Sequence, residues 1–139
     1  MIEARLKWAG GIRFEGASAF GHTIVTDGAK KAGGAESGYK PTELVLFGLA
    51  GCTGVDVVKI LEKMRQELTG VEIEVKGYQP EEYPKPYNKI EVKYVFKGKN
   101  LDNKKIEKAI DLSENKYCMV SLSLMGVANI SSSYEIIEE

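Results

Sequence analysis

Two cysteines, Cys52 and Cys118, are the residues of this chain best suited to chemistry. Cys52 lies in "LFGLAGCTGVDVVKIL", the most apolar run of the sequence. A cysteine in such a place is either a small buried hydrophobe or a thiol whose reactivity is tuned by its surroundings. Composition alone leaves both alternatives open.

The residues just after Cys52 bear on this choice. Thr53 and Asp56 have the spacing of a capping box, with Asp in place of the usual Glu or Gln, and they precede an apolar run. A helix that begins at Thr53 would place Cys52 at its N-terminus, where the backbone N–H groups favour a thiolate. The alternative is one unbroken helix over residues 42–66, which removes most of that effect.

Three glycines recur at every third position around Cys52, namely Gly48, Gly51 and Gly54. Each of them is costly inside a helix. They indicate either close packing against another backbone or a helix break with room for a substrate beside the sulfur.

Cys118 lies in "ENKYCMVSLSL", after a predicted helix and before an apolar segment. By itself it is more simply explained by core packing. The spacing of the two cysteines along the chain does not show whether they meet in space.

The elements that must position these thiols follow from hydrophobic periodicity. Alternating apolar residues predict six strands, and a period near 3.6 predicts two helices. The strands are expected over 2–8, 12–14, 20–26, 70–78, 89–97 and 128–137, and the helices over 42–66 and 103–117. We expect residues 2–8 to be half-buried and Ala9-Gly10-Gly11 to turn the chain into a hairpin. This order predicts an α+β fold with antiparallel sheet.

The first predicted helix has an unusual composition. Pro41 suits its start, since the missing N–H would be unpaired there in any case. Residues 44–50 are apolar on all sides and should be buried on every face. In a domain this small, such burial calls for a partner chain.

The bulk properties narrow the class of protein. A length of 139 residues predicts a single domain over 1–139, and a net charge of −1 argues against nucleic-acid binding. One histidine and no Cys-x-x-Cys pair leave no plausible zinc ligand set, and no cofactor motif is present. The N-terminus does not read as a signal peptide and residues 44–50 are too short to cross a membrane, so we expect a cytoplasmic protein.

The two cysteine motifs carry a resemblance to a known family. "KPTELVLFGLAGCTGVDVV", "KYCMVSLSL" and a short N-terminal β-meander together resemble the OsmC/Ohr family of thiol-dependent peroxidases, over the whole chain and in order. The resemblance implies an OsmC-like fold and an intertwined homodimer with the two central helices packed between curved sheets. It also implies that Cys52 is the peroxidatic residue and Cys118 the resolving one.

The resemblance further implies a cation beside the reactive thiol. In the hydroperoxide reductases this is an arginine that a glutamate orients, and Arg13 in the first hairpin is the matching candidate. Glu43 is the candidate glutamate, although in the reductases that residue directly follows the proline and here Thr42 stands there. A shift of one residue turns a helical side chain by about 100°.

Two functions are therefore expected from the sequence. The first is a two-cysteine peroxidase that reduces organic peroxide or hydrogen peroxide and is restored by a thiol reductant. The alternative is a stress-associated or ligand-binding module of the same fold with weak or no turnover, which the displaced Glu43 motivates.

Overall fold

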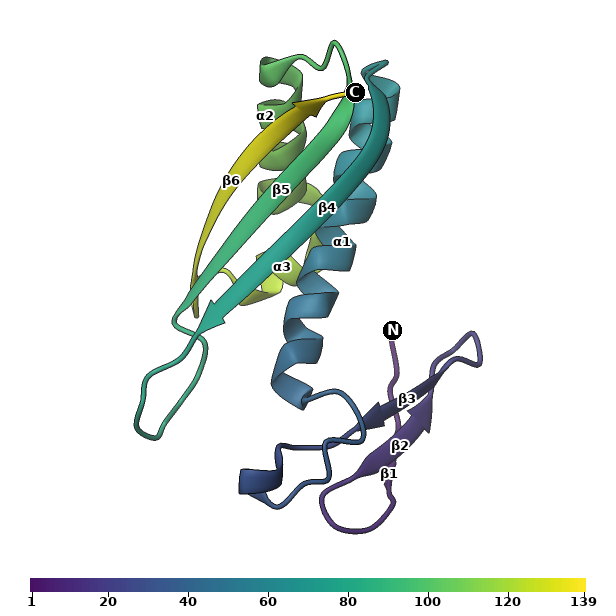
Figure 1. Ribbon diagram of the computed structural model, residues 1–139, viewed down its shortest axis with the longest axis vertical. Coiled ribbons are helices and arrows are strands. Elements are labelled where there is room, and N and C mark those ends of the chain that lie inside the picture. Colours follow the sequence, from purple (N-terminus) through teal and green to yellow (C-terminus); the bar gives the residue numbers. More distant parts are fainter. The chain divides into compact units, whose positions relative to one another are not determined.

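A computed structural model describes residues 1–139, in two compact units, Met1–Val45 and Leu46–Glu139 (Figure 1). The elements in chain order are β1 (Leu6–Trp8), β2 (Phe14–Ala17), β3 (Thr23–Thr26), η1 (Lys30–Ala32), α1 (Pro41–Lys63), β4 (Glu67–Tyr78), β5 (Lys89–Lys99), α2 (Asn103–Leu112), η2 (Ser113–Tyr117), α3 (Met119–Leu124) and β6 (Asn129–Glu138). This order confirms the α+β class, and it adds the short helix α3.

The first unit carries an antiparallel sheet in the order β1-β2-β3. The predicted hairpin is confirmed, with Gly10 and Gly11 both at positive φ in its turn, where glycine is favoured. The expected half-burial of the first strand is not observed. Trp8 is 65% exposed and Ile2 is 90% exposed, because within this unit no second apolar layer covers that face of the sheet.

The second unit is built on a sheet in the order β4-β5-β6, and the three helices lie on one of its faces (Figure 1). β4 and β5 are antiparallel, but β5 and β6 are parallel, so the expectation of purely antiparallel sheets is wrong for this sheet. The physical reason is the connection between β5 and β6. The chain passes through α2, η2 and α3 before β6, and such a helical crossover returns a strand in the same direction.

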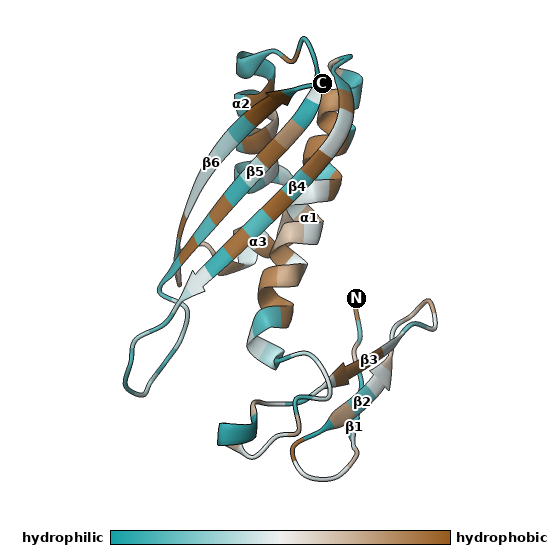
Figure 2. Cartoon of the chain, viewed as in Figure 1, coloured by the Kyte–Doolittle hydropathy of each residue, from teal (hydrophilic) through white to brown (hydrophobic).

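The core lies between this sheet and the helices. The inward-facing residues of β5 are almost completely buried, namely Ile90, Val92, Tyr94 and Phe96. Figure 2 shows the alternation of apolar and polar residues along β4 and β5. From α2, Ile106, Ala109 and Ile110 complete this core.

Helix α1 is continuous through Cys52, so the capping-box interpretation of Thr53 and Asp56 is wrong and the unbroken helix is confirmed. Three glycines cost about 1 kcal/mol each inside a helix relative to alanine. Burying an aliphatic side chain contributes roughly 1.5–3 kcal/mol, and α1 buries Leu49, Val57 and Leu61. Packing against the sheet therefore outweighs the glycines.

By length and composition α1 could also cross a membrane. The core helix of a soluble protein meets the same criteria. Here one face of α1 is packed into the core, so this helix does not indicate a membrane protein.

A cluster of hydrogen bonds around Asp27 organises the loop of the first unit. The Asp27 carboxylate accepts bonds from the backbone N–H groups of Gly28, Ala35 and Ser37 and from the Ser37 hydroxyl. The Ser37 hydroxyl bond, followed by those of the Gly28 and Ser37 N–H groups, lowers the pKa of Asp27 to about 2.

We predict that these bonds lose their strength in acid. Folding lowers the pKa of this carboxyl, so the carboxylate stabilises the folded state fully at pH values above its ordinary pKa of 3.8. This stabilisation is lost as the pH falls through about 2. The amide NMR signals of Ala35 and Ser37 should therefore titrate with a midpoint near pH 2. In Asp27→Asn this titration should be absent. A midpoint near 3.8 in the wild type would show that the bonds do not stabilise the carboxylate.

Candidate active site

The structure brings the two cysteines together within the second unit. Cys52 lies in the middle of α1, and Cys118 lies between η2 and α3. Both are free thiols, and their side chains are within hydrogen-bonding contact. Cys52 is half-buried, whereas Cys118 is completely buried. Only Cys52 is therefore open to a molecule that arrives from solvent.

The surroundings of Cys118 keep its proton on the sulfur. Burial, with a smaller contribution from the hydrogen bond with Cys52, raises the pKa of Cys118 to about 11. The backbone N–H of Ser121 donates to the Cys118 sulfur at 3.4 Å, which opposes this increase. Because burial dominates, Cys118 is a neutral thiol at neutral pH. Cys118, and not Cys52, is the cysteine that caps a helix, at the start of α3.

A buried polar network lies beside the thiol pair, since Thr53 follows Cys52 in α1 and the Ser113 carbonyl accepts a bond from the Cys118 N–H. The Thr53 hydroxyl is 2.8 Å from the Tyr94 hydroxyl and 2.7 Å from the Ser113 hydroxyl. The Tyr94 hydroxyl is 2.8 Å from a Glu114 carboxyl oxygen, and Ser113 donates to Asp56 at 3.0 Å. Asp56, read from the sequence as a helix cap, is thus an acceptor at one end of this network.

Sequence reasoning missed Tyr94, Ser113 and Glu114 as neighbours of the thiols. For Tyr94 a signal was present, because it falls on the inward-facing row of β5 and a buried tyrosine hydroxyl usually finds a partner. Ser113 and Glu114 begin the π-helical turn η2, which nothing in the local pattern distinguishes from the end of α2. Such turns frequently occur at functional sites.

Arg13 and Glu43, the two charged candidates, both belong to the first unit. Arg13 forms a two-bond ion pair with Glu15, at 2.6 and 2.9 Å. Glu43 accepts a hydrogen bond from the backbone N–H of Lys40 at 2.9 Å. Glu43 therefore caps the start of α1, and the carboxylate that orients Arg13 in this structure is Glu15.

The glycines around Cys52 have different surroundings. A Cβ at Gly54 would lie 3.1 Å from Ile73, so this glycine allows close packing of α1 on β4. A Cβ at Gly48 or Gly51 would meet no atom within 4 Å. These two positions leave open space on the same helix as Cys52.

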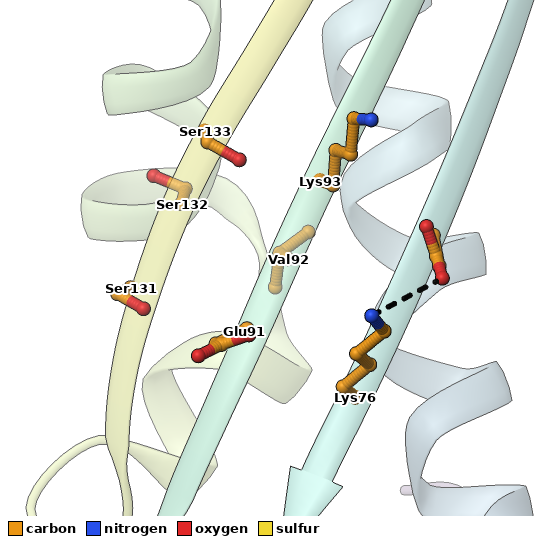
Figure 3. Close-up of a pocket in the computed structure, with 8 residues that line it drawn as sticks. Lys76, Glu91, Val92, Lys93, Ser131, Ser132 and Ser133 are labelled. Atoms are coloured by element: carbon orange, nitrogen blue, oxygen red, sulfur yellow. Dashed lines mark ion pairs between the residues drawn. The ribbon is translucent and has the colours of Figure 1, made fainter.

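The outer side of the sheet carries a cleft of a different character (Figure 3). It has a volume of about 310 Å³ and is lined by Glu74, Lys76, Glu91, Val92, Lys93, Ser131, Ser132 and Ser133. Lys76 pairs with Glu74 at 3.7 Å, and both side chains are about 60% exposed. This cleft holds exposed charges and no thiol, and it is therefore separate from the cysteine pair.

These features define a class of protein: an α+β domain with one cysteine on a long core helix and a second one buried against it. A family model described as OsmC-like protein matches residues 33–133. The chain belongs to this OsmC-like family.

Several bacterial proteins are similar to this chain over nearly its whole length. Protein YhfA of Escherichia coli K12 is 37% identical over 136 residues, which cover 98% of each chain. The crystal structure of a hypothetical protein from Aquifex aeolicus VF5 has a TM-score of 0.88 and 34% identity, covering all of this chain and 98% of that one. The organic hydroperoxide resistance protein OhrB of Bacillus subtilis has a TM-score of 0.66 and 21% identity, covering 96% and 98%, and shares the fold.

We predict that the Thr53 hydroxyl is important for stability. Thr53→Val keeps the shape of the side chain but leaves the Tyr94 and Ser113 hydroxyls short of a buried partner. The free energy of unfolding, measured by urea denaturation, should fall by about 1–3 kcal/mol. Thr69→Val removes an exposed hydroxyl and is the matched control, with an effect below about 0.5 kcal/mol. Equal effects of the two substitutions would contradict the prediction.

Proposed function

We propose that this protein is a thiol-dependent peroxidase in which Cys52 reacts with the peroxide and Cys118 resolves the product. The observation that carries the proposal is the unequal pair of thiols. Their sulfur atoms are in contact, but only Cys52 is accessible, and Cys118 is buried and protonated. This asymmetry supports separate roles for an attacking and a resolving thiol.

The first step of the proposed reaction takes place at Cys52. Its thiolate attacks one oxygen of the peroxide, so that an S–O bond forms and the O–O bond breaks. The other oxygen leaves with a proton as alcohol or water, and Cys52 becomes a sulfenic acid. The open space beside Gly48 and Gly51 is where we place the rest of the substrate.

The second step uses Cys118. Its sulfur attacks the sulfenic sulfur of Cys52, an S–S bond forms, and the hydroxide leaves as water with the proton from Cys118. A dithiol or small thiol then reduces the disulfide by exchange and restores both thiols. The contact between the two sulfur atoms supports this step, because little movement is needed to form the bond.

We assign Arg13 the role of the cation that stabilises negative charge at Cys52 during attack. Its two-bond pairing with Glu15 supports this role, since a carboxylate fixes the direction of the guanidinium. We retain Glu43 as a second carboxylate proposed to orient Arg13, in addition to its bond to the Lys40 N–H at the start of α1.

We also propose that the protein acts as a homodimer. Large apolar side chains on α1 and near α3 are exposed in the single chain, namely Phe47, Val55, Met119, Leu122 and Val127. Exposed large apolar residues on a core helix support an interface at that helix. A second copy packed against α1 would cover them and would form an outer wall of the substrate space beside Gly48 and Gly51.

We predict that Cys52→Ser reduces peroxide consumption to the rate of a protein-free solution. Cys118→Ser should still react with one equivalent of peroxide but should accumulate sulfenic or sulfinic acid at Cys52. Oxidised wild-type protein should show a Cys52–Cys118 disulfide within one chain, seen by mass spectrometry as the loss of two hydrogens at the monomer mass.

The control for this experiment is the reaction of peroxide with a small free thiol at equal concentration. Two free thiols after oxidation, or a sulfinic acid at Cys52 without a disulfide, would contradict the resolving role of Cys118. A wild-type rate no higher than that of the free thiol would favour the alternative, a stress-associated or ligand-binding module with little turnover.

For the dimer, we predict a mass in solution of twice 15.3 kDa by light scattering. Val55→Glu places a charge on the exposed face of α1 and should shift the protein to the monomer, because burying an unpaired charge costs several kcal/mol. Lys108→Glu changes an exposed charge on α2 and should leave the dimer intact. A wild-type monomer would contradict the assignment.

A further inference from the structure

Five polar side chains of the second unit form one continuous chain of hydrogen bonds behind the thiol pair. In order they are Asp56, Ser113, Thr53, Tyr94 and Glu114. The four oxygen–oxygen distances along it are 3.0, 2.7, 2.8 and 2.8 Å. Each of these distances is that of a real hydrogen bond.

The number of protons in this chain reveals its charge state. Each bond needs one hydrogen between its two oxygens, so four bonds need four hydrogens. The three hydroxyls of Ser113, Thr53 and Tyr94 supply one each. If both end groups were carboxylates, one short oxygen–oxygen contact would have no proton. One of the two carboxyl groups must therefore carry the fourth proton.

The surroundings of Glu114 favour it as the protonated end. Burial raises the pKa of the Glu114 carboxyl, and the nearby Asp111 carboxylate on α2 raises it further. Hydrogen bonds with Tyr94 on β5 and Ser132 on β6 act in the opposite direction but are outweighed. Glu114 also lines an open cleft of about 310 Å³, from which it can exchange its proton with solvent.

We propose that Glu114 holds a proton at neutral pH and is a positioning residue for Cys118, because its neutral form keeps negative charge away from the resolving thiol. Two contacts link them. Ser121 donates its backbone N–H to the Cys118 sulfur. It also donates its hydroxyl to the Glu114 backbone oxygen, at 3.0 Å. The Tyr94 hydroxyl, bonded to Glu114, interacts electrostatically with Cys118 as well.

The consequence for the reaction rests on the function proposed above. Cys118 loses its proton as it begins to attack the sulfenic sulfur of Cys52, so its sulfur carries negative charge before the S–S bond has formed. That proton leaves with the hydroxide as water. A carboxylate at Glu114 would oppose that charge, whereas a neutral carboxyl does not. Glu114 keeps its own proton before and after the step. Its ionisation would therefore slow resolution as the pH rises.

The protonation state is tested by infrared spectroscopy on the reduced protein at pH 7. A protonated carboxyl has a carbonyl band that carboxylates lack. This band should be present in the wild type, lost in Glu114→Gln, and retained in Asp56→Asn and in Glu107→Gln, an exposed carboxyl of the same cleft. No band in the wild type, or a band lost in Asp56→Asn instead, would overturn the proposal.

The effect on Cys118 is tested by the pH dependence of disulfide formation after one equivalent of peroxide. The wild-type rate should fall severalfold below that of Glu114→Gln as the pH rises above 7, with equal rates near neutrality. A loss of the same size in Glu114→Gln at every pH would indicate a merely structural role and would overturn the assignment to Cys118. If no disulfide forms in the wild type, the proposed function fails, while the infrared band still decides whether Glu114 is protonated.

Discussion

The packing of one face of α1 against the sheet is the interaction on which the rest of the site depends. Leu49, Thr53, Val57 and Leu61 recur every four residues and are almost completely buried. Cys52 precedes one of them and so lies at the border of the packed face, partly covered and partly open. A rotation of the helix by one residue, about 100°, would bury the sulfur or turn it away from Cys118. Helix packing thus sets the accessibility of Cys52.

The crossover from β5 to β6 supplies the second thiol. Its turn η2 lets the backbone N–H of Cys118 bond to the Ser113 carbonyl at 2.7 Å, which ends η2 and starts α3. The same turn presents Ser113 and Glu114 to the inner side of the sheet. A buried hydroxyl without a partner would cost about 1–3 kcal/mol. The connected chain from Asp56 to Glu114 avoids that cost while placing polar groups beside two thiols in an otherwise apolar core.

Much of the fold could be predicted from local patterns, and the errors have physical causes. Alternation predicted β4, β5 and β6, because every second residue of a strand faces the core. It could not give the direction of β6, since parallel and antiparallel strands alternate in the same way. The spacing of Thr53 and Asp56 predicted a helix start, but the burial of Thr53 made it the centre of a hydrogen-bond network instead.

The sequence by itself determined the α+β class, the two thiols and the motifs that mark the OsmC-like family. These depend on residue types and on the periods of helices and strands, which are local properties of the chain. Only the tertiary structure decided that Cys52 meets Cys118, that Cys118 is the buried thiol, and that Glu114 ends a chain of hydroxyls behind them. Those contacts join residues about 20 to 66 positions apart, and their distances depend on the packing of helices on the sheet, which no local pattern encodes.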